Sequence, residues 1–452
     1  MKTTKIFMMA ALALTFAACS NDDNDMQNHA QQPQQAEGIT ITATLAPKTN
    51  GAATRKVSEG TGDAAGTIVA EWAVDEHIAI LYNKDGAQIA DATIKSVDAN
   101  GVATIEFTVE SGTANNTACT LVYPAKLSDN TTTVYKDDKS GVKAYADLLA
   151  TQDGVLDGDL DVRVGAGTIQ TTTPSLTVST QPEAQYSIFK FTAQDISGTA
   201  ITPSEFKVSD SEGNVITTVS PSASAFHVAL PALSASTYWF SATASGKPYI
   251  AKATATATTA GKYYQTTVKM ATIGDVILSD GKFAPSSSTG TKVAKIAYVG
   301  SETGETGYAH GLALAMSDAG SDYKWSTSNT DAHTTKQTSD TFESESGLQY
   351  NAIHNTSDYP AFQAAISNNG TVAPTGYSAW FLASGYQWKQ MINAYGLDNL
   401  KATADGYTGL QSRYWSSTEC DASRAWFFHA DDGKWDSVTE GSAYLVRSCL
   451  AF

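Results

Sequence analysis

Five runs rich in β-branched and aromatic residues decide the fold of this chain: TIVAEWAV (67–74), HIAILYN (77–83), ATIKSV (92–97), VATIEFTVE (102–110) and CTLVYPA (119–125). Turn residues such as Lys84-Asp85-Gly86 separate them. Short strands punctuated by turns in this way are typical of an antiparallel sandwich. This part of the chain is therefore predicted to form a β-sandwich.

A second series of strand-like runs fills residues 174–270. It comprises SLTVST (175–180), YSIFKFTAQ (186–194), SEFKVSD (204–210), NVITTV (214–219), AFHVAL (225–230), TYWFSATA (237–244) and YIAKATATAT (249–258), and it closes on GKYYQTTVKM (261–270). The same reasoning predicts a second antiparallel sandwich.

The pattern changes after Gly274-Asp275, where helical periodicity joins the strands. One helix is expected over Tyr359–Asn368 with Asp358 as N-cap, and another from Ser384 to Tyr395, stopped by Gly396. Strands are expected in KVAKIAYVG (292–300), RYWSSTE (413–419), RAWFFHAD (424–431) and AYLVRSCLAF (443–452). Two helices beside a small sheet predict an α+β domain.

Upstream of the first sandwich, ITITATL (39–45) alternates apolar and polar residues. Ile39, Ile41, Ala43 and Leu45 fall on one face, which predicts a half-buried strand. Arg55, followed by Lys56, lies shortly after it in a Gly/Ala/Thr-rich linker. An arginine in such a linker is what a trypsin-like protease needs, so the strand is predicted to be removable by cleavage there. The alternative is an ordinary loop arginine.

The extreme N-terminus reads as a leader. Lys2 and Lys5 precede an apolar stretch over 6–18, and Cys19 follows the small residues of a cleavage site. The sequence thus predicts a bacterial lipoprotein acylated at Cys19, the alternative being a plain signal peptide. The polar stretch 20–36 is predicted to be a flexible tether, since it has too few apolar residues to fold.

Bulk composition narrows the functional classes. The formal charge of −17 argues against nucleic acid or anionic membrane surfaces as partners. Cysteines are few, and neither they nor the histidines have metal-ligand or catalytic spacing, so no enzyme activity, metal or cofactor is expected. Cys119 lies in an apolar run and is interpreted as a small buried residue.

Several of these segments resemble one family in order and spacing. Trp72–Ile80, the strand end Tyr123-Pro124, the segment Asp147–Ala150 and the closing Gly261–Met270 are similar to the fimbrillin family of Bacteroidales pilins, over roughly residues 37–270. The resemblance implies two transthyretin-like sandwiches, a lipoprotein precursor at the outer membrane and cell surface, and cleavage at Arg55. It also implies assembly with other pilus subunits by donor-strand exchange. A generic pair of surface sandwiches is the alternative.

The last domain has a second resemblance. Trp380–Ser384, Tyr414–Glu419 and Val446–Cys449 are similar to the C-type-lectin-like modules of bacterial surface proteins. In those modules a disulfide often ties the last strand to a neighbouring loop. Whether Cys420 and Cys449 form such a disulfide is left open by the sequence. No Glu-Pro-Asn or Gln-Pro-Asp triplet for calcium occurs in residues 275–452. Formylglycine-generating oxidases share the fold, but their cysteines lie close together, unlike Cys420 and Cys449.

A glycan or protein ligand is therefore expected to bind through aromatic stacking and hydrogen bonds. Trp435, predicted to be exposed, and Trp426 are the candidate aromatics, with Asp431 and Asp432 beside them, whereas Trp388 and Trp415 are predicted to fill the core.

The expected organisation is a signal peptide (1–19), a tether with the removable strand (20–55), two sandwiches (56–172 and 173–271) and a lectin-like domain (272–452). The final segment 443–452 is expected to be locked in its sheet, leaving no donor strand, so a pilus tip subunit and adhesin is predicted. The alternatives are a monomeric surface-anchored lipoprotein that binds a glycan or protein, and a basal pilus anchor.

Overall fold

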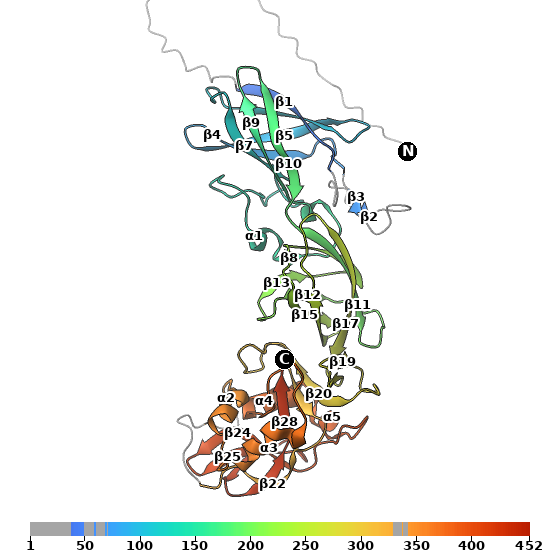
Figure 1. Cartoon of the computed structure of the whole chain (residues 1–452), viewed down its shortest axis with the longest axis vertical. Coiled ribbons are helices and arrows are strands. Elements are labelled where there is room, and N and C mark those ends of the chain that lie inside the picture. Colours follow the sequence, from blue (N-terminus) through green and yellow to red (C-terminus); the bar gives the residue numbers. More distant parts are fainter. Residues whose placement is uncertain (1–37, 49–57, 60–67, 70, 329–336, 338–341) are drawn as a thin grey trace, which may run out of the picture.

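The computed structural model describes residues 38–48, 58–59, 68–69, 71–328, 337 and 342–452. Within these residues the chain is mostly β, as predicted, and its sheets are largely antiparallel. Three bodies follow one another along the long axis of a rod, with the C-terminus at the junction of the second and third (Figure 1). No described helix is long and apolar enough to cross a membrane.

The first body is a seven-stranded sheet in the order β1-β6-β5-β4-β7-β9-β10. Its strands are β1 (Ile39–Leu45), β4 (His77–Asn83), β5 (Ala87–Val97), β6 (Ala103–Val109), β7 (Thr117–Tyr123), β9 (Arg163–Gln170) and β10 (Ser175–Ala184). The sheet curls around one core, which side chains from β1, β4, β5, β6 and β7 share.

The predicted strand Ile39–Leu45 is confirmed as β1. It pairs antiparallel with β6 along its whole length, from Ile39 opposite Val109 to Leu45 opposite Ala103. Burial alternates as the sequence predicts: Ile41, Ala43 and Leu45 are buried, and the intervening threonines are exposed. Because β1 is at the end of the strand order, it is an edge strand of this sheet.

The second body is an eight-stranded sheet in the order β14-β11-β17-β16-β15-β12-β13-β8. Its strands are β8 (Thr151–Gln152), β11 (Ser187–Asp195), β12 (Glu205–Ser209), β13 (Val215–Val219), β14 (Ala225–Leu230), β15 (Ser236–Ala244), β16 (Lys247–Ala255) and β17 (Tyr263–Thr272). The helix α1 (Tyr145–Leu149) and the 3-10 helix η2 (Gly158–Leu160) belong to the connection between the two sheets.

Two strands expected from the sequence are placed differently. The run at 175–180, expected to open the second sandwich, is part of β10 and pairs with β9 in the first sheet. The run at 67–74 is not one strand: Ile68–Val69 (β3) pairs with Ser58–Glu59 (β2), and the chain turns at Asp75, whose φ is 67°. A positive φ ends an extended run, which periodicity alone does not reveal.

The third body has two small sheets and most of the helices. One sheet holds β18 (Val276–Leu278), β19 (Phe283–Ala284), β20 (Lys292–Val299), β21 (Gly311–Ala315), β23 (Phe381–Leu382) and β28 (Ser448–Ala451). The other holds β22 (Gly320–Lys324), β24 (Arg413–Asp421), β25 (Arg424–His429), β26 (Trp435–Thr439) and β27 (Ala443–Val446). The helices are α2 (Gly347–Ile353), α3 (Pro360–Ser367), η3 (Asn368–Gly370), α4 (Gly385–Tyr395) and α5 (Leu397–Lys401).

Both expected helices form. α4 begins after Ser384, whose side chain makes a capping box with Gln387, and it ends at Gly396. The N-cap of α3, however, is Tyr359 rather than the predicted Asp358. Asp358 instead uses its backbone carbonyl to accept a hydrogen bond from the Thr327 amide at 2.8 Å. Pro360 at the first turn starts α3 without a side-chain cap.

The predicted C-terminal strand 443–452 is two strands in two sheets, β27 and β28, which break at Arg447. The Arg447 side chain is buried and donates to Asp318 Oδ1 at 2.6 Å and to the Thr408 carbonyl at 2.8 Å. These partners lie far away in the sequence, so the local pattern did not reveal the break.

Continuous apolar cores join the three bodies. Leu81 and Val122 of the first sheet share one buried cluster with Ile188 and Ala229 of the second. At the other junction Trp239 of β15 packs in one cluster with Phe452 at the end of the chain. Because both junctions are buried apolar contacts, we expect the rod to move as one stiff unit.

Candidate functional site

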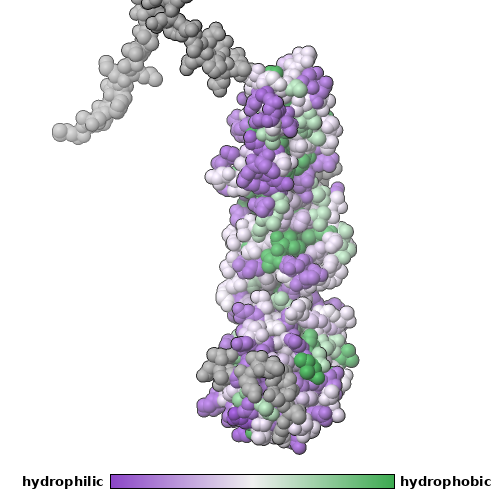
Figure 2. Space-filling model, turned by 90° about the vertical axis from the view of Figure 1, so that its left-hand side faces the viewer, coloured by the Kyte–Doolittle hydropathy of each residue, from purple (hydrophilic) through white to green (hydrophobic). Residues whose placement is uncertain are grey.

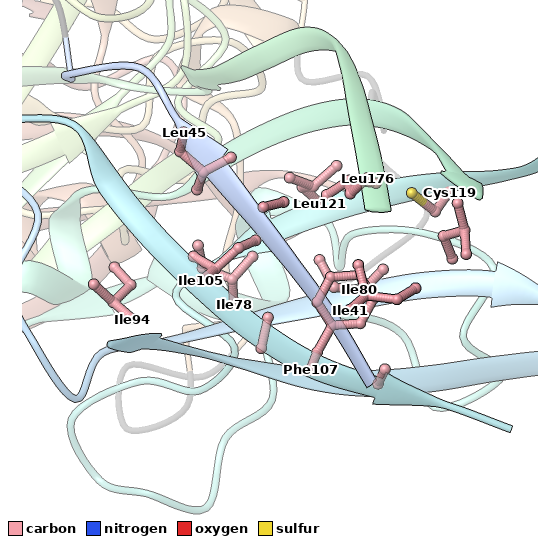
Figure 3. Close-up of a cluster of buried hydrophobic side chains, with 14 of the residues drawn as sticks. Ile41, Leu45, Ile78, Ile80, Ile94, Ile105, Phe107, Cys119, Leu121 and Leu176 are labelled. Atoms are coloured by element: carbon pink, nitrogen blue, oxygen red, sulfur yellow. The ribbon is translucent and has the colours of Figure 1, made fainter. Parts of the chain in front are cut away.

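The first candidate site is the seat of β1 in the first sheet. Ile41 and Leu45 point from β1 into the core, where Ile105 and Phe107 of β6 and Leu121 of β7 surround them (Figure 3). Ile41 and Leu45 are fully buried. Burying a side chain of this size stabilises a fold by ~1.5–3 kcal/mol. β1 therefore closes the core of the first body.

Besides its backbone ladder to β6, β1 is held by two hydrogen bonds just after its C-terminal end. The Ala46 amide donates to Gln181 Oε1 of β10 at 3.1 Å, and Trp72 Nε1 donates to the Ala46 carbonyl at 2.9 Å. β10 itself pairs with β9. Loss of β1 would thus leave the backbone of β6 unpaired along one edge and would expose the apolar core side chains that β1 covers.

Lys48, just after β1, is buried in a socket of one carboxylate and two aromatic rings. Its Nζ lies 3.4 Å from Asp161 Oδ2, 4.2 Å from the ring centre of Trp72 and 3.8 Å from that of Tyr123. The two rings meet edge to face, with centroids 5.2 Å apart. Asp161 also accepts from Arg163 Nε at 2.8 Å. The socket fixes the end of β1 through charge and cation–π contact.

Electrostatics mark this socket as a low-dielectric site. Burial lowers the pKa of Lys48 to about 8, against the opposing effect of Asp161. Burial likewise raises the pKa of Asp161, against Lys48 and Arg163. The Tyr123 hydroxyl donates to Glu76 Oε1 at 2.9 Å. Removing either charge would leave the other in an unfavourable environment.

Cys19, Arg55 and Lys56 lie outside the described residues, so their expected roles stay predictions. The first described residues after that gap are anchored on the second sheet. Glu59 of β2 accepts from Lys190 Nζ at 2.6 Å and from the Tyr263 hydroxyl at 2.9 Å, and its carboxylate lies 3.0 Å from His227 Nε2. The hydrogen bond from Lys190 chiefly lowers the pKa of Glu59 to about 2. The chain beyond the expected cleavage point is thus held independently of β1.

The predicted ligand-binding aromatics lie close together on β25 and β26. Trp435 is half-buried rather than exposed, because Phe342 packs edge to face on it with ring centroids 4.7 Å apart. Phe342 also contacts Trp426, whose Nε1 donates to the Gln337 carbonyl at 2.9 Å. The sequence could not show this, because residue 342 is remote from both tryptophans in the chain.

The predicted acidic residues beside Trp435 are exposed. Asp432 pairs with Lys434 at 2.6 Å, and the Asp431 carbonyl accepts from Lys401 Nζ at 3.1 Å. The turn around Gly433 brings Phe428 of β25 opposite Trp435 of β26. These residues therefore share one edge of the third body. Trp388 and Trp415 are fully buried, which confirms their predicted core role.

Cys420 and Cys449 are free thiols, so the disulfide left open by the sequence is not formed. Cys420 lies near the end of β24, whereas Cys449 lies on β28 in the other sheet of the third body. Burial raises the pKa of the Cys449 thiol well above its usual value. Cys119 is buried in the first core, as predicted. In the described part of the chain no group of acidic, histidine and cysteine residues is arranged to hold a metal.

An apolar groove of 590 Å³ opens in the second body and was not anticipated from the sequence. Its lining includes Phe189, Leu230, Phe240 and Tyr264. It opens because β16 and β17 pair only where Tyr249 and Ile250 meet Thr272 and Ala271. Apolar patches interrupt the otherwise polar surface midway along the rod (Figure 2).

Sequence reasoning located β1 but missed the Lys48 socket. Lys48 comes three residues after Leu45, the last residue of β1, and in the sequence it looks like any solvated loop lysine. Its charged neighbours in the structure, Asp161 and Arg163, lie more than a hundred residues away along the chain. The sequence analysis did single out Trp72 and Tyr123, but only as parts of the fimbrillin resemblance. The rings of both contact Lys48.

No protein-family model matches the chain, and a comparison with curated proteins found no match. Among solved structures, a fimbrial protein from Bacteroides ovatus is 12% identical, with 92% of this chain and 99% of that chain covered and a TM-score of 0.33. A candidate cell adhesion protein from Bacteroides uniformis is 13% identical, covering 53% of this chain and 94% of that one, with a TM-score of 0.29. A fimbrial assembly protein from Parabacteroides distasonis is 12% identical, covering 51% and 90%, with a TM-score of 0.28.

Proposed function

We propose that this chain is a pilus subunit that accepts a strand from a neighbouring subunit in place of β1. The observation that carries the proposal is the position of β1: an edge strand with one partner, β6, and three buried side chains, Ile41, Ala43 and Leu45. Removing it would expose a row of backbone donors and acceptors and an apolar groove. Such an edge favours β-strand addition from another chain.

Cleavage at Arg55 would favour replacement of β1 by the incoming strand over its return. The cut lies between β1 and β2, so β1 would lose its covalent tie while Glu59 keeps the remaining chain on the second sheet. Acylation of Cys19 would hold the precursor at the outer membrane until then. In this proposal the lipid, the polar tether and β1 leave together.

The third body supports a place at the pilus tip. Its last strand, β28, pairs with β21 on one side and with β23 on the other. Phe452 is buried at the junction with the second body. A strand paired on both edges is not available as a donor, so β28 cannot extend the filament. The subunit would then receive a strand without giving one.

The same body would provide adhesion. We propose a C-type-lectin-like module whose ligand, a glycan or a protein, binds at the edge that carries Trp426, Trp435, Asp431 and Asp432. Half-buried aromatic faces flanked by carboxylates suit stacking and hydrogen bonding to sugar hydroxyls. No metal or cofactor takes part in this proposal.

A disulfide that locks β1 onto β6 tests the proposal. Thr40 and Thr108 are opposite each other in the ladder, and their hydroxyl oxygens are 3.2 Å apart. Cysteines at directly opposed positions come close enough to bond. The double variant Thr40→Cys/Thr108→Cys should be cleaved normally but should not enter filaments until a reductant releases β1.

The single variants Thr40→Cys and Thr108→Cys are the matched controls and should assemble with or without reductant. Filament incorporation is measured by blotting of sheared pili. If the oxidised double variant enters filaments as readily as the single variants, β1 is not exchanged and the proposal is wrong.

A monomeric surface lipoprotein is the second candidate. The observation that favours it is that β1 is packed into the core of the first body and that the side chain of Lys48 beside it is fully enclosed. In that case the chain from cells would keep residues 39–48 and its lipid. A basal pilus anchor would likewise keep its lipid but would sit at the filament base.

A further inference from the structure

Lys48 belongs to the segment that the proposed cleavage removes, yet it is as well packed as a core residue. Its side chain is fully enclosed, and so is the side chain of Asp161 with which it pairs. Buried lysines are rare in proteins and are normally paired when they occur. The first body therefore buries a charged side chain that belongs to the segment removed in the proposed cleavage.

Departure of β1 and Lys48 would leave a socket built for a cation. Asp161 would keep Arg163 but lose the ammonium group 3.4 Å away, and the faces of Trp72 and Tyr123 would lose their cation. Trp72 Nε1 would also lose the carbonyl of Ala46, its acceptor at 2.9 Å. An incoming segment without a cation would leave these groups less well satisfied than they are with β1.

The socket also solves a register problem. Apolar and polar residues alternate along β1, so a slip of one residue would turn the threonines into the core. A slip of two residues would keep an apolar face inward, and the apolar groove alone discriminates weakly against it. A fixed cation site at one end of the groove distinguishes these registers, since only one of them brings the charge to Asp161.

We infer that the socket of Trp72, Tyr123 and Asp161 selects a donor strand that carries lysine or arginine three residues after its last buried apolar side chain, as Lys48 follows Leu45. The partner is thus an extended segment of another subunit with alternating apolar residues and a cation at that position. This inference rests on the proposed strand exchange and adds the feature of the donor that sets its register and identity.

Peptide replacement in the cut chain tests this directly. The full chain is made with a specific protease site in place of residues 51–54, is cut, and is mixed with fluorescent peptides of the sequence 38–50. Binding is followed by anisotropy as the labelled peptide displaces the cut segment. The peptide of natural sequence and its Lys48→Arg variant should bind, whereas Lys48→Met should bind about ten- to a hundredfold more weakly.

Two further peptides sharpen the test. Thr42→Met changes an exposed residue of β1 to the same side chain and should bind like the natural peptide, so it controls for added methionine. A peptide with Lys48→Ala and Pro47→Lys moves the cation by one residue. A slip of one residue that returned the cation to the socket would turn the threonines of β1 into the core, so this peptide should bind as weakly as Lys48→Met. Equal binding of this peptide and the natural one would overturn the register role.

The outcomes separate the inference from the function on which it rests. If the natural and Lys48→Met peptides bind equally well, the groove accepts strands but the socket selects nothing, and only the inference falls. If no peptide binds the cut chain, the groove does not accept a strand, and both the inference and the proposed exchange are wrong.

Discussion

Leu45 and Thr44 are neighbours in β1 with opposite environments, because successive side chains of a strand point to opposite faces. Leu45 is fully buried against the first core, and Thr44 faces solvent. At the residue scale the attachment of β1 thus depends on a few buried side chains and on Lys48 at its end.

We predict that Leu45→Ala destabilises the first body by ~2–5 kcal/mol, the usual range for truncating a buried leucine. Thr44→Ala, the matched control, should change stability by less than ~0.5 kcal/mol. Hydrogen exchange of the β1 and β6 amides measures both effects locally. Equal protection in the two variants would show that β1 is not held by its buried face.

His310 is predicted to make the junction of the second and third bodies sensitive to acid. Its ring stacks on Trp239 with centroids 4.2 Å apart, and burial lowers its pKa to about 4. Between about pH 6.5 and 4 the unfolded chain therefore binds a proton that the folded chain does not. Stability from this group is present above pH 6.5 and is lost as the pH falls toward 4.

His310→Phe keeps an aromatic ring on Trp239 but cannot titrate. Between pH 7 and pH 4.5 the variant should therefore lose less stability than the natural chain, by on the order of 2 kcal/mol in the free energy of unfolding. Its melting temperature should fall correspondingly less. Thermal unfolding at the two pH values measures this. Identical pH dependence would assign the acid sensitivity to other groups.

At the scale of elements, the parts predicted well are those with local causes. β1 follows from strict alternation, and α4 follows from the Ser384 cap and the Gly396 stop. The break at Arg447 could not be predicted, because it depends on a buried contact with Asp318 from a distant part of the chain. The Phe342 cover on Trp435 escaped prediction for the same reason.

We predict that the double variant Arg55→Ala/Lys56→Ala, which leaves no basic residue at the expected cleavage point, blocks incorporation into filaments without unfolding the chain, since β1 would stay tied to the first sheet. Arg55→Lys keeps a trypsin-like site and serves as the control. Shearing, blotting and mass analysis of the sheared fraction report assembly and cleavage together. Normal assembly of an uncleaved Arg55→Ala/Lys56→Ala chain would exclude maturation by strand removal.

At the scale of the molecule, the chain is a rod in which β1, the strand proposed to be exchanged, and β28 lie at different places along the axis (Figure 1). β1 lies in the first body, while β28 is locked in the third and Phe452 is buried beside the second. If β1 is exchanged as proposed, the rod would have an acceptor groove at one end and a closed module at the other, which suits the end of a filament.

The tip position predicts that immunogold particles directed at the third body mark about one site per filament, at the end far from the cell. This follows because a subunit that accepts a strand but donates none can occur only once in a chain of exchanges. Label spread along the shafts would contradict the tip position, and label at the base would favour the anchor.

The central claim is that β1 leaves the mature protein, and intact mass measurement of the chain recovered from filaments tests it most directly. We predict a mass that corresponds to residues 56–452, without lipid and without Ile39–Leu45. A filament-derived chain that begins at acylated Cys19 and still contains β1 would contradict the account.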